Sequence, residues 1–199
     1  MKLIRLIPQS PFFCLLTIFL LQSLAATSQT FHVSKADISV TGTAREKSWS
    51  MKTNTAQGSA NLLFKDGKLA QVRSLNLSIP VGELKSDNPR MDARAYKGLK
   101  MYPYDRIRFA GKTMKLSGSG TGSYRLFTEG NLQIAGITQV AILLVDIQVN
   151  NDGTLTGRGT TEIKRSDFDI RLLAAEEAVM SLSDVIRVDF QLTLSRIGN

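Results

Sequence analysis

Cysteine and histidine are almost absent from this chain of 199 residues, which carries one of each, Cys14 and His32. Structural zinc sites need several cysteine or histidine ligands, and transition-metal sites commonly use histidine. A Ser–His–Asp triad would have to use His32, which lies near the start of the expected mature chain. The sequence therefore predicts no metal site, no cofactor and no catalytic residue, and we expect a protein that is not an enzyme.

Paired carboxylates, which can carry out acid–base chemistry, are also few. Two pairs of aspartates lie near each other in the sequence, Asp87 with Asp92 and Asp167 with Asp169, and Asp105 stands alone. They flank expected helix caps and turns, where an aspartate commonly accepts hydrogen bonds from its own backbone. We interpret them as structural residues.

Signatures of nucleic-acid and nucleotide binding are missing as well. The chain has no dense basic run and no RNA-binding aromatic motif, so no nucleic-acid partner is expected. The glycines at 118, 120 and 122 are not a dinucleotide-binding loop, because no helical pattern follows them. The net charge of +8 is a moderate basic excess that favours anionic lipid or phosphate groups.

Long apolar runs occur only at the start of the chain. Lys2 and Arg5 precede an apolar core of about ten residues, Phe12–Leu21, which is too short to span a bilayer. Residues 1–25 are therefore predicted to be a signal peptide, cleaved near 25–28, and the alternative is an uncleaved N-terminal anchor. Cys14 leaves with the signal, so the mature chain folds without disulfides. We expect export to the periplasm of a Gram-negative-type envelope, or secretion.

What is abundant is the two-residue alternation of a half-buried strand. The clearest case is the set of alternate apolar residues Ile186, Val188, Phe190, Leu192 and Leu194 near the C-terminus, which we expect to face inward. Short turn signals such as Asp66-Gly67 and Ala135-Gly136 separate similar segments. Many strands joined by short turns predict an antiparallel meander that closes into a barrel or folds into a sandwich. No linker divides residues 29–199, which form one expected domain.

Two features of the strands leave alternatives open. The Ile137–Val149 run is apolar on both faces, which is typical of a strand that is central or covered on its outside. Small residues occur where a packed core would hold leucine or valine: Ala56, Gly58 and Ala60 on one strand, and Gly157, Gly159 and Thr161 on another. They either make room for a ligand or mark bulges and bends. Trp49 and Met51 either line a cavity or belong to plain core.

One helix is predicted in this β-rich chain, at about residues 89–99. Asn88 is a suitable N-cap, Pro89 suits the first helical position, and Pro103 prevents continuation. Its apolar side carries Met91, Ala95 and Leu99, and its basic side carries Arg90, Arg94 and Lys97. We expect the apolar side to close a barrel opening, because a lone helix must bury that side on the available core. The basic side is either a rim that meets a lipid phosphate or an anionic membrane surface, or an ordinary solvated face.

The order of several segments resembles the YceI-like family of bacterial exported proteins. The residues that carry the resemblance are the helix and Tyr102-Pro103 turn running into Ile107–Phe109, residues 130–138, residues 163–170, and Asp184–Ile186. The resemblance implies an antiparallel, lipocalin-like β-barrel with a helix near its mouth and a long apolar cavity. One departure is Asp169, which stands where the family pattern has glycine.

The resemblance also implies a function, which is to bind a polyisoprenoid, an isoprenoid quinone or another long-chain lipid without catalysis. The alternative is a structural or stress-related envelope protein whose barrel is filled by its own side chains and which acts through a protein partner. The sequence leaves open whether the protein is a monomer or a homodimer. The residues expected to contact the ligand are Met91, Ala95, Leu99, Tyr102, Ile107, Phe109, Leu132, Ile134, Gly157, Gly159 and Phe168.

Overall fold

A computed structural model describes residues 27–45, 47–118, 122–171 and 181–196. The predicted signal peptide and its cleavage region up to residue 26 lie outside the described residues, as do residues 119–121 of the glycine tract. The strands are β1 (Thr27–Ala44), β2 (Lys47–Thr53), β3 (Gln57–Lys65), β4 (Lys68–Pro80), β5 (Arg106–Gly118), β6 (Ser123–Ile134), β7 (Ile137–Val149), β8 (Leu155–Lys164) and β9 (Val185–Arg196). The helices are η1 (Val81–Glu83), α2 (Pro89–Gly98) and η2 (Arg165–Phe168).

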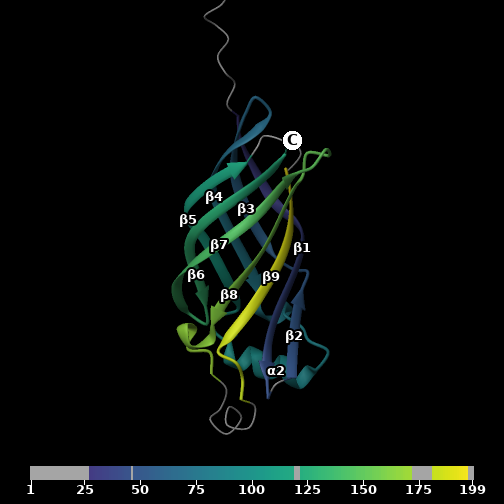
Figure 1. Cartoon of the computed structure of the whole chain (residues 1–199). Coiled ribbons are helices and arrows are strands. Elements are labelled where there is room, and N and C mark those ends of the chain that lie inside the picture. The colour runs from purple at the N-terminus through teal and green to yellow at the C-terminus, as the bar shows by residue number, and fades with distance from the viewer. Residues whose placement is uncertain (1–26, 46, 119–121, 172–180, 197–199) are drawn as a thin grey trace, which may run out of the picture.

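The strands form one closed antiparallel barrel (Figure 1). β3 to β9 follow one another as neighbours, and β1 closes the sheet by pairing with β9 from Phe31 to Thr41. The other edge of β1 is shared, because its first part pairs with β3 and its last part with β2. Eight strands thus close the barrel, and β2 extends its wall at one end, which confirms the predicted fold class.

The alternation in the sequence decides which side chains fill the barrel. On β9 all five residues of the predicted inward set, Ile186, Val188, Phe190, Leu192 and Leu194, face the interior. Their intervening neighbours face outward, where Arg187 and Asp189 form an ion pair of 2.8 Å between Nη2 and Oδ1. When a sheet with one apolar face closes on itself, that face is removed from water, and no second sheet or layer of helices is needed to cover it.

One end of the barrel is filled by its own side chains. The buried residues of this packed end are Phe31, Ala60, Leu62, Leu69, Val72, Tyr124, Leu126, Val145 and Leu155. The hydroxyl of Tyr124 accepts a hydrogen bond from the backbone N–H of Leu69 at 3.1 Å. That bond satisfies β4 where it does not pair with β5, since these two strands pair only over Asn76–Pro80 and Arg106–Ala110.

The outer face of β7 carries apolar side chains that are exposed to solvent. β7 pairs with β6 along its length and with β8 over Asp146–Val149. It is therefore central in the sheet, which was one of the two positions expected for a strand that is apolar on both faces. No described element covers its outside, however. Val140, Ile142 and Leu144 are 66%, 53% and 55% exposed.

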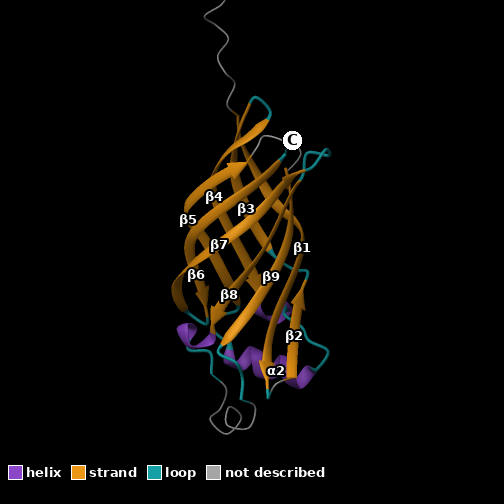
Figure 2. Ribbon diagram, in the orientation of Figure 1, coloured by secondary structure: helices purple, strands orange, loops and turns teal. Residues whose placement is uncertain are grey.

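The predicted helix is α2, and it lies across the end of the barrel opposite the packed end (Figure 2). Its N-cap is Asn88, whose side-chain oxygen accepts hydrogen bonds from the N–H groups of Arg90 (3.0 Å) and Met91 (3.3 Å). The Tyr96 hydroxyl donates to the carbonyl oxygen of Leu84 at 2.8 Å and ties the helix to the segment after β4. No described helix is long and apolar enough to cross a membrane.

Candidate functional site

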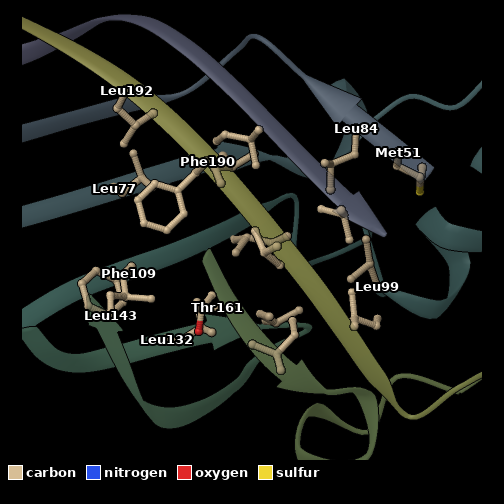
Figure 3. A pocket seen from close by; sticks show the side chains of 18 of the residues that line it. Met51, Leu77, Leu84, Leu99, Phe109, Leu132, Leu143, Thr161, Phe190 and Leu192 are labelled. Carbon is tan, nitrogen blue, oxygen red and sulfur yellow. The ribbon is translucent and has the colours of Figure 1, made fainter. Parts of the chain in front are cut away.

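An apolar cavity of about 350 Å³ runs inside the barrel between the packed end and α2. Figure 3 shows Leu77, Phe190 and Leu192 on the left of this cavity and Met51, Leu84 and Leu99 on the right. Its size falls within the range of ligand pockets. The atoms that line it are almost all carbon, because the inward positions of the surrounding strands are aliphatic or aromatic. The cavity can therefore hold a hydrocarbon group and offers very few hydrogen bonds.

Most of the side chains predicted to contact a ligand are brought together here. α2 contributes Met91 and Ala95, and its C-cap contributes Leu99; the three residues are four positions apart and so share one face of the helix. The strands contribute Ile107, Phe109, Leu132, Ile134 and Gly157. Gly157 leaves open space, because a Cβ atom there would meet only Cγ1 of Val145, at 3.2 Å.

Tyr102 and Phe168 do not line the cavity, contrary to expectation. Tyr102 follows α2 in the turn and is 85% exposed, because the turn carries the chain outside the barrel. Phe168 is 3% exposed and packs with Ile134 and Ala135 in a small cluster under η2. The Phe168 side chain thus anchors η2 to the barrel wall.

Gly159 also does not line the cavity, although it lies on the same strand face as Gly157. It pairs with Phe190 on β9, and the ring of Phe190 lies over it. A Cβ atom at Gly159 would be 2.5 Å from Cζ of Phe190 and 2.6 Å from the carbonyl oxygen of Leu144. Gly159 therefore makes room for an aromatic ring of the protein itself, and the space predicted there for a ligand is occupied.

The three basic residues of α2 separate into two environments. All three are exposed, but Arg90 and Lys97 do not line the cavity. Arg94 lies on the same face as Met91 and Ala95, and part of its side chain lines the cavity. The spacing of the three residues could not distinguish these positions, because it fixes only their relation to one another.

Arg165 lines the same end of the cavity and was not predicted. Its guanidinium donates hydrogen bonds to the carbonyl oxygens of Ser183 (2.9 Å) and Ile170 (3.1 Å). It thereby joins the start of η2 to the segment that leads into β9. Within the sequence the residue appears only as one basic residue of the 163–170 segment, with no pattern that places its stem on the cavity.

Trp49 lines the cavity from β2, which decides one of the alternatives left open by the sequence. It pairs with Gly42 on β1, and its indole ring lies against that glycine. A Cβ atom at Gly42 would be 2.5 Å from Cζ2 of the ring. The indole Nε1 is buried and has no hydrogen-bond partner.

The carboxylates near this end hold the backbone together. Asp92 accepts hydrogen bonds from the hydroxyl (2.6 Å) and the N–H (2.8 Å) of Ser86, and the hydroxyl bond is the main cause that lowers the pKa of Asp92. Asp169 adopts a left-handed backbone with φ of 50° and accepts from Nζ of Lys100 at 3.0 Å, which lowers its pKa. An aspartate tolerates this backbone conformation, so the glycine of the family pattern is not required. Among the described residues, no three His, Cys, Asp or Glu side chains gather into a group that could hold a metal ion.

The chain is similar to known proteins both in sequence and in fold. Residues 24–194 match the family model described as the YceI-like domain. A polyisoprenoid-binding domain from Saccharophagus degradans, implicated in plant cell wall breakdown, superposes with a TM-score of 0.68 at 10% identity, covering 84% of this chain and 98% of that one. BcnA of Burkholderia cenocepacia gives 0.64 at 19% identity, covering 80% and 96%. The YceI protein of Campylobacter jejuni gives 0.53 at 22% identity, covering 70% and 81%. These structures share the fold, and no curated protein matches the chain.

Proposed function

The chain belongs to the YceI-like family, and from this membership we propose that it binds the hydrocarbon chain of a polyisoprenoid, an isoprenoid quinone or a similar amphiphile in its barrel. The observation that carries the proposal is the cavity, which is walled by carbon and bordered by α2. One structural neighbour is described as a polyisoprenoid-binding domain, which agrees with this assignment.

The energy of binding comes from removing the chain of the ligand from water. Each buried methylene group contributes about 0.8 kcal/mol, so an isoprenoid chain is held without many polar contacts. No reaction is required for this function, and the carboxylates near the cavity are engaged by Ser86 and Lys100. A barrel filled by its own side chains, the alternative interpretation of the sequence, is less consistent with open space beside Gly157.

We further propose that the protein acts in the periplasm and receives its ligand at a membrane surface. The support for the location is the N-terminal segment, with its two basic residues and its short apolar core. The support for a membrane surface is the set of exposed basic residues on α2, Arg90, Arg94 and Lys97, beside the cavity.

The proposal is tested with protein purified from the periplasm of the organism that makes it. Native mass spectrometry should detect a bound species whose mass corresponds to a long-chain lipid, and solvent extraction should release that species for identification. The delipidated protein should then bind geranylgeraniol, a twenty-carbon isoprenoid alcohol. A protein that carries no lipid and binds no isoprenoid after delipidation would contradict the proposal.

A further inference from the structure

Trp49 is the one tryptophan of the chain, and its indole nitrogen is an exception to the pattern of satisfied polar groups. Nε1 is buried and makes no hydrogen bond. An indole N–H can only donate, and buried donors in native proteins nearly always have an acceptor. A buried donor without a protein partner therefore needs an explanation, and an acceptor on a bound ligand would supply one.

The position of the ring is set by glycine. Gly42 and Trp49 are paired residues on β1 and β2, and the ring lies in the space that a side chain at position 42 would take. The would-be Cβ atom at Gly42 is 2.8 Å from Cε2 of the ring and 3.1 Å from Nε1. Only glycine admits the ring so close to the β1 backbone, and this contact keeps the indole inside the barrel, where it lines the cavity.

The neighbours of the ring identify the end of the cavity at which it lies. Val40 and Ala44 on β1 and Met51 on β2 line the same cavity. β2 is joined to the segment before α2 by backbone hydrogen bonds between Lys52 and Lys85, of 2.7 and 2.9 Å. Trp49 therefore lies at the α2 end, opposite the packed end.

Among the described residues, one other buried side-chain polar atom lacks a partner, Oγ1 of Thr128. Thr128 is fully buried in β6 and does not line the cavity. It lies beside Gly111, where a Cβ atom would be 3.0 Å from Oγ1. The unpaired donor at the cavity is thus Trp49 Nε1–H, in a wall that otherwise presents carbon.

We propose that Trp49 selects the polar end of the ligand, by donating a hydrogen bond from Nε1–H to an oxygen atom of the amphiphile. The bond forms as the ring moves away from Gly42 when a ligand enters. The amphiphile then lies with its oxygen at the α2 end, and its hydrocarbon tail points toward the closed, packed end. This inference rests on the proposed function, and it adds the orientation of the ligand and the residue that discriminates an oxygen-bearing lipid from a hydrocarbon.

The acceptor is an oxygen of an alcohol, a quinone or a phosphate, and these sources share the same chemistry. The stems of Arg94 and Arg165 line the same end, so a charged head would meet basic residues there. The test therefore uses geranylgeraniol, geranylgeranyl phosphate and a menaquinone as separate arms, and an isoprenoid hydrocarbon of matched length without oxygen as the control.

The first measurement uses the indole N–H resonance of the ¹⁵N-labelled, delipidated protein, which has a single tryptophan. The oxygen-bearing probes should move this resonance downfield, and the hydrocarbon should not produce that shift. The arm whose shift saturates at the lowest probe concentration identifies the preferred head. An indole resonance that responds equally to the hydrocarbon and to all three oxygen-bearing probes would overturn the proposal.

The second measurement removes the donor and keeps an aromatic ring. Trp49→Phe should weaken binding of the best oxygen-bearing probe by about fivefold, the effect of one hydrogen bond, and should leave hydrocarbon binding nearly unchanged. Thr128→Val removes the other unpaired group and should change neither affinity. Equal losses for both kinds of probe in Trp49→Phe would mean that the ring contributes only packing and would overturn the proposal.

Orientation is measured by quenching of the single tryptophan. A bromine atom placed next to the oxygen of the probe should quench Trp49 fluorescence strongly, and a bromine at the far end of the chain should quench it weakly. The reverse order would overturn the proposal even if binding is tight. Failure of every probe to bind, hydrocarbon included, would contradict the proposed function, and the inference would be lost with it.

Discussion

The two ends of the barrel are built from the same strands and differ in what fills them. At the packed end, Phe31 and Leu69 are 1% and 3% exposed, and the Tyr124 hydroxyl bonds to the backbone of β4. At the α2 end, the interior is bordered by a helix, and the ring of Trp49 lies over Gly42 and lines the cavity. The rings of Phe31 and Phe64 are 6.1 Å apart at the first end, whereas the cavity extends from the edge of that packed cluster to α2.

The difference shows how one alternating pattern can produce both a core and a binding site. Inward positions are apolar along the whole barrel, so closure alone does not decide whether the interior is full. The interior is full where Phe31, Leu69 and Tyr124 meet. It opens into the cavity on the side of the same core cluster that faces α2, where Ala60, Leu62 and Val145 line it. Stability should therefore depend mainly on the packed end, and ligand binding on the α2 end.

The largest expected effect is on the free energy of unfolding when leucine is replaced by alanine at one end or at the other. Leu69→Ala at the packed end should lower the free energy of unfolding by about 2–5 kcal/mol, because it leaves a cavity in close-packed core. Leu99→Ala at the α2 end should cost about 1 kcal/mol, since Leu99 is only half buried and already borders open space. Urea unfolding of the delipidated variants measures both.

Binding should show the opposite order. Leu99→Ala removes a contact with the ligand and should weaken binding of geranylgeraniol, whereas Leu69→Ala should leave affinity nearly unchanged while the protein is folded. Equal destabilisation by the two variants would mean that the α2 end is packed as tightly as the other, and the comparison of the ends would fail.

Local features of both ends were predictable from the sequence. The cap of α2 was predictable because Asn88 and Pro89 act on adjacent backbone groups and need no distant partner. The inward set of β9 was predictable too, because the two-residue period is a property of the strand itself. The comparisons and the structure confirm the antiparallel barrel that these patterns and the family resemblance predicted.

What could not be predicted depends on register between strands that are distant in sequence. Whether Gly159 faces open space or a ring is decided by its partner Phe190, thirty-one residues further along the chain. The contact of Trp49 with Gly42 likewise depends on which residue of β1 lies opposite. Tyr102 was misplaced because the direction of a turn after a helix is set by the packing of the whole end. A period of two cannot specify any of these relations.

The second effect concerns two glycines on one strand. Gly157→Leu places a side chain in the cavity with a single close contact, so the protein should fold and should bind geranylgeraniol at least about tenfold more weakly, since the leucine displaces several methylene groups of the ligand. The affinity of the delipidated variant, measured by fluorescence titration, checks this.

Gly159→Leu is the matched substitution with a different expected result. Its side chain would meet the Phe190 ring and the β7 backbone, so the loss should appear as a lower free energy of unfolding. Unchanged affinity in a folded Gly157→Leu variant would show that the ligand does not reach β8. A Gly159→Leu variant as stable as the wild type would show that the space beneath Phe190 is open.

The smallest effect concerns surface charge at the two ends. Replacing Arg90 and Lys97 by glutamine should leave stability almost unchanged, because exposed charges contribute little. It should slow the capture of ligand from vesicles that contain anionic lipid by about fivefold at low salt, below the roughly thirtyfold limit set by two basic residues worth about 1 kcal/mol each near such a surface. The rate should approach that of the wild type as salt is raised, because screening weakens the attraction for both.

The matched control is the removal of two charges from the packed end. Lys65 and Lys68 are exposed on either side of the β3–β4 turn, and glutamine at both positions changes the net charge by the same amount. If the membrane meets the α2 end, this control should capture ligand nearly as fast as the wild type. If both double variants slow capture equally, overall charge and not a particular surface attracts the protein to the vesicle. If neither does, the basic residues of α2 are an ordinary solvated face, and the ligand reaches the cavity without an electrostatic approach to the membrane.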